Sequence, residues 1–213
     1  MTTTAALILF ACATLLGTFP TAFLLVRRAT GRDLRKEGSG NIGTLNAYEV
    51  TRSRSVGVVV LLIDVIKGSV PVVFAIRLFP DEILSGALAT IGVVLGHNYS
   101  PWIGFKGGRG LASAAGAMLV FNPLLLLYWV GFWGVAFARR RDVHFGNIAA
   151  SVLSPILLAF TPGLALLMAG FPVENAWQQP AVASAVCLLI LIRHIGPIRQ
   201  LFAPRTSPTE TTS

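Results

Sequence analysis

The hydrophobic pattern of this chain consists of long apolar runs separated by short polar connections. A helix needs about 20 apolar residues to cross a bilayer, and several of these runs are that long, while the third and fourth are shorter. The pattern predicts an all-α integral membrane protein, a compact bundle of about seven transmembrane helices. The seven runs cover residues 5–26, 55–79, 83–96, 110–121, 123–138, 146–169 and 180–193.

Turn residues mark where the apolar runs break. Asn122-Pro123 is a turn signal that separates the fourth and fifth runs, and Thr161-Pro162-Gly163 is the expected break in the sixth. The first run has no positive residue before it, is long for the apolar region of a signal peptide, and stops at Arg27-Arg28. It is therefore interpreted as a membrane helix rather than a cleaved signal.

Composition supports the membrane assignment and suggests one domain. Of 213 residues, 54% are hydrophobic and only 12% are charged, whereas a soluble domain carries about 25% charged residues. Because the connections are short, residues 1–202 are expected to form a single domain, and the Pro-, Thr- and Ser-rich end, 203–213, a disordered cytoplasmic tail. Cys12 and Cys187 both lie in apolar runs and indicate no disulfide, zinc or redox motif.

The net charge of +8 is explained by membrane topology. If the N-terminus is outside, 15 of the 17 basic residues fall on the inner side, as cytoplasmic loops require. This predicts an outside N-terminus and a cytoplasmic C-terminus, and it leaves no need for a nucleic-acid partner. The same topology places all three histidines, His97, His144 and His194, on the cytoplasmic face.

Two glycine-rich segments carry the candidate chemistry. The first glycine loop, 38–44, and the second glycine loop, 96–110, both interrupt apolar sequence on the predicted cytoplasmic face. Glycine lets backbone N–H groups turn toward an anion, and Lys106 and Arg109 add positive charge beside them. The run that begins at Gly110 predicts a helix, whose N-terminus also attracts phosphate. The two loops are interpreted as phosphate-binding cradles.

Other polar residues in apolar sequence have two readings each. Asp64 and Lys67 are three residues apart on one helix face, so they form either a buried structural pair or a support for the first glycine loop. His97, at the end of an apolar run, is either an interfacial residue or a group that moves a proton. A metal site made by the three histidines matches no known spacing, so no metal and no cofactor is expected.

The chain has no nucleophile elbow, no Walker lysine-serine pair and no His-x-x-x-x-Asp pairing. Its chemistry is therefore expected to rest on positioning phosphate and on an already activated substrate. The chain resembles the bacterial integral-membrane acyl-phosphate:glycerol-3-phosphate acyltransferases over most of its length. The resemblance rests on Gly38-Ser39-Gly40-Asn41-Ile42-Gly43-Thr44-x-Asn46, on Asp64-x-x-Lys67-Gly68, on Gly96-His97-Asn98-Tyr99-Ser100-Pro101 and on Phe105-Lys106-Gly107-Gly108-Arg109-Gly110-Leu111-Ala112-Ser113.

This resemblance implies transfer of a fatty acyl group from acyl phosphate to the 1-hydroxyl of glycerol 3-phosphate. The products are lysophosphatidic acid and phosphate, in the first step of phospholipid synthesis. It also implies a multi-pass protein of the bacterial plasma membrane with its active site facing the cytoplasm. The expected partners are the two substrates, membrane lipids and the enzyme that supplies acyl phosphate.

The resemblance also assigns roles to individual residues. It implies a catalytic group of His97, Ser39 and Arg109, with Asp64 and Lys67 in support. The expected substrate-binding residues are Gly40, Asn41, Ile42, Gly43, Thr44, Asn46, Lys106, Gly107, Gly108, Gly110, Arg52, His144 and His194.

The chain departs from the family pattern where glycerol 3-phosphate is expected to bind. Glu49 stands where an arginine is usual, Pro197 stands where an asparagine is usual, and the third motif reads His144-Phe145-Gly146-Asn147. Two alternatives therefore stay open. One is a related acyltransferase with a different acceptor, or a weakened homologue that binds acyl phosphate. The other is a small anion transporter, although no convincing inverted repeat is present.

Overall fold

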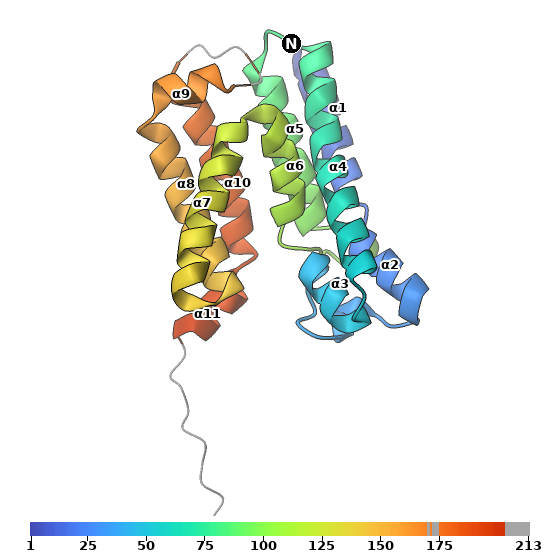
Figure 1. Cartoon of the computed structure of the whole chain (residues 1–213). Helices are drawn as coiled ribbons and strands as arrows, with labels where there is room; N and C mark the ends of the chain where they lie inside the picture. Colours follow the sequence, from blue (N-terminus) through green and yellow to red (C-terminus); the bar gives the residue numbers. More distant parts are fainter. Residues whose placement is uncertain (170, 172–174, 203–213) are drawn as a thin grey trace, which may run out of the picture.

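The computed structural model describes residues 1–169, 171 and 175–202, and the predicted tail, 203–213, lies outside them. The described residues form helices and connections without a β-strand. Figure 1 shows the long helices side by side in one elongated bundle. The stretch Thr3–Thr30 and helix α4 (Arg54–Leu78) are each long and apolar enough to cross a membrane. The all-α prediction is confirmed.

The first apolar run is two helices, not the single helix predicted over residues 5–26. Helix α1 (Thr3–Gly17) and helix α2 (Thr21–Thr30) are separated by a short break. Pro20 explains the break, because proline has no N–H to donate and disfavours helical geometry in the residue before it. The break leaves backbone carbonyls inside the bundle, where side chains from other helices reach them.

Helix α6 (Leu111–Phe121) begins where the glycine-rich sequence predicts and packs closely on α4. A Cβ on Gly68 would come within 2.1 Å of the Ser113 carbonyl oxygen, and one on Gly116 within 2.0 Å of the Val65 carbonyl oxygen. Glycine at both positions therefore lets the two helix backbones touch, as small residues commonly do between membrane helices. This contact fixes the depth of α6 and of the loop before it.

The other long helices complete the bundle. Helix α5 (Ile83–Asn98) lies against α1, while α7 (Pro123–Arg140) and α8 (Val143–Ala159) form an antiparallel hairpin beside α10 (Gln178–Ile192). The predicted turn before α7 is confirmed, since the Asn122 side chain caps that helix and proline follows at its first position.

The sixth apolar run also breaks where predicted. Helix α8 ends at Ala159, and α9 (Pro162–Leu167) begins at the proline of the predicted break. The sequence did not predict the short helices, because they lie in the polar segments between or after the apolar runs. These are η1 (Leu34–Lys36), α3 (Thr44–Thr51), η2 (Pro101–Ile103) and α11 (Ile195–Phe202).

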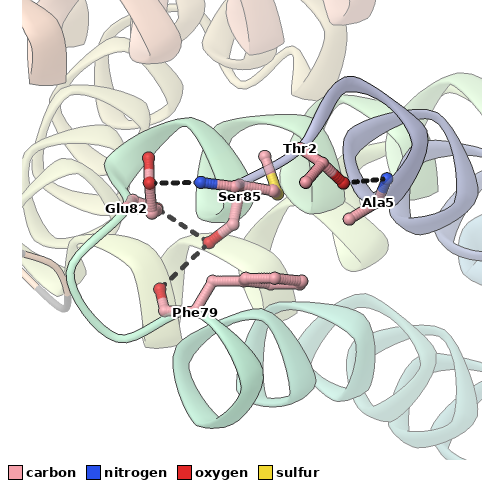
Figure 2. Close-up of polar contacts among 6 residues, drawn as sticks. Thr2, Ala5, Phe79, Glu82 and Ser85 are labelled. Carbon is pink, nitrogen blue, oxygen red and sulfur yellow. Dashed lines mark hydrogen bonds and ion pairs between the residues drawn. The ribbon is translucent and has the colours of Figure 1, made fainter.

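The two ends of the bundle differ in character. At one end the amino group of Met1 pairs with Glu82 in the turn between α4 and α5. Figure 2 shows the same turn, in which the Ser85 hydroxyl donates to the Glu82 carbonyl at 2.7 Å, next to the Thr2 cap of α1. Helices α2, α3 and α11 lie at the opposite end (Figure 1), together with both glycine loops.

Candidate active site at the glycine loops

The second glycine loop packs closely against His97. The Gly108 N–H donates to the His97 carbonyl oxygen at 3.1 Å. A Cβ on Gly107 would come within 2.0 Å of that carbonyl oxygen, and one on Gly108 within 2.1 Å of the imidazole Nε2. No side chain fits at either position, so bare backbone lies next to the imidazole.

The two glycine loops meet at the same point. A Cβ on Gly108 would also come within 2.6 Å of the carbonyl oxygen of Ile42, in the first glycine loop. Ile42 is buried and anchors this contact in the core beside α2. Two segments that are far apart in the sequence thus share one surface next to His97.

The first glycine loop is shaped by the side chain of Asn46. Its Oδ1 accepts from the Ser39 N–H at 3.0 Å, and its Nδ2 donates to the Asn41 and Glu37 carbonyl oxygens at 2.9 and 3.1 Å. Gly38 adopts a left-handed conformation with φ of +56°. Asn46 is fully buried, and its amide is occupied by the loop it holds. The structure therefore gives Asn46 a supporting place beneath the cradle.

His97 is the centre of a buried polar cluster. Its Nδ1 lies 3.1 Å from the Ser113 hydroxyl and 4.0 Å from Asp64 Oδ1. Asp64 pairs with Lys67 at 2.7 Å, and the Lys67 ammonium donates to the Phe19 carbonyl oxygen at 2.9 Å. Asp64 and Lys67 are therefore buried and paired, a geometry that fits both readings of these residues, and the lysine also satisfies a carbonyl freed by the break between α1 and α2. Ser113, which supports His97 from α6, was not predicted.

A second cluster joins α8, the second glycine loop and the end of α10. Arg109 Nη1 lies 3.2 Å from His144 Nδ1, and the rings of His144 and His194 have their centroids 6.1 Å apart. His194 Nδ1 donates to the Ile190 carbonyl oxygen at 2.8 Å. Its Nε2 must then accept from the Asn147 amide, at 3.3 Å. Two of the three histidines therefore lie side by side.

His194 is held as a neutral imidazole. Its side chain is fully buried, and burial lowers its pKa to about 4, although the bond to the Ile190 carbonyl acts in the opposite direction. Both ring nitrogens already have partners. His194 therefore lies on the buried side of the cluster, whereas His144 is partly exposed.

Arg109 and Arg193 form a cationic pair at this site. Burial lowers the pKa of the Arg109 guanidinium, and the nearby Arg193 charge lowers it further, while arginine stays protonated in proteins. In the part of the chain that the structure describes, neither side chain has an ion pair with a carboxylate. Two such cations without an acidic partner favour an anionic ligand.

Arg193 is a residue that sequence reasoning used only as evidence for topology. Its Nε donates to the Gly108 carbonyl oxygen at 3.0 Å, and its Nη2 donates to the Gly107 carbonyl oxygen at 2.8 Å. Its guanidinium lies over the Tyr99 ring, 5.4 Å from the centroid. The only signal in the sequence is an arginine at the end of the last apolar run, and such arginines are common for topological reasons.

The remaining predicted residues lie around these clusters. Ser39, Lys106 and Arg52 have exposed side chains that make no hydrogen bond to other described residues. The Thr44 hydroxyl is buried at the start of α3, and Gly110 leads into α6 with φ of +81°. Among the described residues, no three histidine, cysteine or acidic side chains are grouped to hold a metal ion.

An apolar cavity of about 140 Å³ begins beside the second glycine loop. It runs between α6, α7 and α10 and starts at Leu111, the first residue after the loop. Its wall contains almost no polar surface, so it suits a hydrocarbon. It is lined by Leu111, Ala114, Ala115, Met118, Leu125, Leu126, Trp129, Val130, Val186, Cys187 and Ile190.

Comparisons with known proteins identify the family and agree with this fold. The glycerol-3-phosphate acyltransferase family profile matches residues 7–204. The glycerol-3-phosphate acyltransferase of Myxococcus xanthus (strain DK1622) is 41% identical over 187 residues, which is 88% of this chain and 91% of that protein. That of Syntrophotalea carbinolica is 35% identical over 195 residues, 91% of this chain and 92% of that protein.

A solved structure has the same fold. The crystal structure of PlsY (YgiH), an integral membrane glycerol 3-phosphate acyltransferase, in its glycerol 3-phosphate form, matches with a TM-score of 0.76 and 31% identity, and the match covers 92% of each chain. The fold and these matches define an integral membrane acyltransferase. The chain belongs to the glycerol-3-phosphate acyltransferase family. The predictions of an enzyme, of an acyltransferase and of a role in phospholipid synthesis are thereby confirmed.

Proposed function

We propose that this enzyme transfers a fatty acyl group from acyl phosphate to the 1-hydroxyl of glycerol 3-phosphate. The names of its relatives support glycerol 3-phosphate as the acceptor, as do the two solved forms of PlsY, described as a glycerol 3-phosphate form and a lysophosphatidic acid form. The observation that carries the proposal is the contact of both glycine loops at Gly108, beside His97. Two phosphate-bearing substrates need two cradles that meet at the reacting atoms.

The reaction needs orientation more than a strong base. The acceptor hydroxyl oxygen forms a bond to the acyl carbonyl carbon, the carbonyl–phosphate C–O bond breaks, and the hydroxyl proton ends on the released phosphate. Arg109 stabilises the charge that develops, together with backbone N–H groups of the second glycine loop other than that of Gly108, which is bonded to the His97 carbonyl oxygen. His97 faces this loop and orients the substrates or relays the proton.

The donor is assigned to the first glycine loop and the apolar cavity. Ser39, the backbone of residues 40–43 and the Thr44 hydroxyl form the phosphate side, with Asn46 holding the loop in shape. The apolar cavity that starts at Leu111 takes the acyl chain. Its apolar wall is what a long hydrocarbon needs. This combination supports acyl phosphate as the donor.

The acceptor is assigned to the second cluster. Arg109, Lys106 and His144 offer positive or donating groups to the glycerol phosphate, while His194 supports His144 from the core. Arg52 lies on the exposed end of α3 and is assigned to substrate entry. Gly107, Gly108 and Gly110 supply the backbone surface.

The membrane setting follows from the same arrangement. We infer a single domain over residues 1–202 with seven spans, an outside N-terminus and a cytoplasmic C-terminus in the bacterial plasma membrane. The support is the excess of basic residues in the connections at one end of the bundle. That end carries α2, α3 and α11 and lies opposite to the N-terminus (Figure 1). A cytoplasmic site gives access to soluble glycerol 3-phosphate and to the enzyme that supplies acyl phosphate.

The test measures phosphate release from palmitoyl phosphate by purified protein, with and without glycerol 3-phosphate. Release that depends on the acceptor, and that is lost in Arg109→Ala, supports the proposal. Binding of acyl phosphate without acceptor-dependent release contradicts it.

One observation favours a different acceptor as the second candidate. The Glu49 carboxylate lies close enough to act electrostatically on His144, and a carboxylate disfavours a phosphate dianion beside it. If glycerol or another neutral alcohol is acylated faster than glycerol 3-phosphate, this second candidate is correct. Glu49→Arg is then expected to restore preference for the phosphorylated acceptor.

A further inference from the structure

We propose that Arg193 is a positioning residue that sets the conformation of the second glycine loop. This inference rests on the proposed function, because the loop is assigned there to the substrates. Arg193 contacts no reacting group itself; it acts through the backbone of Gly107 and Gly108. It thereby couples the end of α10 to a loop about 85 residues earlier in the chain.

The guanidinium binds two successive carbonyl oxygens. Its Nε donates to the Gly108 carbonyl oxygen at 3.0 Å and its Nη2 donates to the Gly107 carbonyl oxygen at 2.8 Å, both ordinary hydrogen-bond lengths, and both donors lie on one edge of the planar group. An arginine presents these N–H donors in a fixed fork. The two carbonyls are thus turned to the same side of the loop, toward α10.

Turning the carbonyls decides where the N–H groups point. The described peptide bonds are all trans, so each N–H lies opposite the carbonyl of its own peptide unit. The N–H of Gly108 shares a unit with the Gly107 carbonyl, and it points to His97, whose carbonyl oxygen accepts it at 3.1 Å. The N–H of Arg109 shares a unit with the Gly108 carbonyl and points away from Arg193. The loop is thus held by hydrogen bonds on both sides, to Arg193 through its carbonyl oxygens and to His97 through the Gly108 N–H.

The same bonds improve the loop as an anion site. A free carbonyl oxygen carries partial negative charge and repels phosphate, whereas here two of them are covered by a cation. The Tyr99 ring, 5.4 Å below the guanidinium, holds that cation in place through a cation–π contact. Arg193 is half-buried, so its orientation is fixed by these contacts rather than by solvent.

The geometry predicts that lysine cannot replace Arg193. An ammonium is a point charge that lacks the planar fork, so Arg193→Lys keeps the charge but cannot hold both carbonyls in register. We expect Arg193→Lys and Arg193→Gln each to lower kcat about 10- to 100-fold, as sub-ångström to ångström misplacement does, with a smaller change in KM for palmitoyl phosphate. Arg199→Gln, an exposed arginine on α11, is the matched control and should keep its activity.

A readout that needs no substrate separates positioning from general stability. Amide hydrogen exchange in residues 104–110 of the unliganded protein should become faster in Arg193→Lys, with α4 and α5 still protected, and unchanged in Arg199→Gln. If Arg193→Lys has wild-type turnover and wild-type exchange, only charge matters and the proposal is wrong. Faster exchange with unchanged kcat also overturns it, since the loop conformation then does not limit the reaction.

A second variant covers the case in which Arg193 substitutions do not fold. Tyr99→Leu leaves both guanidinium bonds possible but removes the ring beneath them, so it should give a weaker form of the same loss, while Tyr99→Phe should not. If the Arg193 variants do not fold and Tyr99→Leu has normal activity and normal exchange, Arg193 is needed only for folding and the proposal is wrong. Failure of the proposed function looks different: wild-type protein then lacks acceptor-dependent phosphate release, although the Arg193 variants still loosen the loop.

Discussion

Gly108 lies so close to His97 that a Cβ on the glycine would come within 2.1 Å of the imidazole Nε2. The same Cβ would come within 2.6 Å of the Ile42 carbonyl oxygen, so one small residue lets the imidazole and both glycine loops come together. The contact explains why glycine, rather than merely a flexible residue, is needed there. It also makes the arrangement easy to test.

Gly108→Ala is expected to abolish most activity without unfolding the protein. The methyl group must push away either His97 or the first glycine loop, and a displacement of that size costs roughly 100-fold in rate. Gly131→Ala on α7 is the matched control, because a Cβ there meets nothing within 4 Å. Phosphate release and apparent Tm in detergent measure both effects. Equal activity of the two variants would show that the close contact has no role in catalysis.

Asp64→Asn should destabilise the protein, because it leaves the buried Lys67 ammonium without its carboxylate partner. Removing one member of a buried pair typically costs about 3–5 kcal/mol. Asp64→Leu combined with Lys67→Met should be less damaging to Tm than the single change. Asp81→Asn, at an exposed site between α4 and α5, is the control and should leave Tm unchanged. A double variant less stable than Asp64→Asn contradicts this account.

Stability should fall when the pH drops below about 6.5. The buried His194 has a pKa of about 4 in the folded protein and an ordinary value of 6.5 when unfolded. The unfolded chain therefore binds more protons between these values, and acid favours unfolding there, by at most about 3 kcal/mol near pH 4. Above pH 7 this residue contributes no pH dependence. Apparent Tm should be measured from pH 4 to pH 8, and its decrease at low pH should be smaller in His194→Gln than in the wild type. An equal decrease in both proteins would rule out this residue as the cause.

Asn46→Asp should disrupt the first glycine loop although the two side chains have nearly the same shape. The variant replaces the donating Nδ2 with an oxygen that faces the Asn41 and Glu37 carbonyl oxygens, and such contacts repel. We expect a rise in KM for palmitoyl phosphate of about tenfold or more, with faster hydrogen exchange in residues 38–44. Asn175→Asp, at an exposed asparagine before α10, should behave as wild type.

Filling the apolar cavity should change the preferred acyl chain. Ala115→Phe places a ring inside the cavity, so turnover of palmitoyl phosphate should fall relative to that of octanoyl phosphate. Leu127→Phe on the outer face of α7, where the side chain is 65% exposed, tests whether added bulk alone matters. An unchanged chain-length ratio in Ala115→Phe would place the acyl chain elsewhere.

Much of the architecture could be predicted from local sequence. Apolar runs indicated an all-α protein, and the proline turns at Asn122-Pro123 and at Pro162 lie where the sequence predicted them. The spacing of Asp64 and Lys67 placed them on one helix face, where they pair. All of these signals act over one or two helical turns. The two glycine loops were also evident from their composition. The exception was the break before Pro20. The long apolar run indicated a single helix, although proline is itself a local signal for a helix break.

The tertiary structure alone decided which distant groups meet. The sequence placed His97, the two glycine loops and the α10 terminus at one end of the bundle, but periodicity contains no distances between helices. Packing of α6 on α4 through Gly68 sets the depth of the second loop, and only then do the Gly107 and Gly108 carbonyls come within reach of Arg193. Each of these contacts joins residues that are far apart in sequence, so their energies depend on the folded backbone rather than on any local pattern.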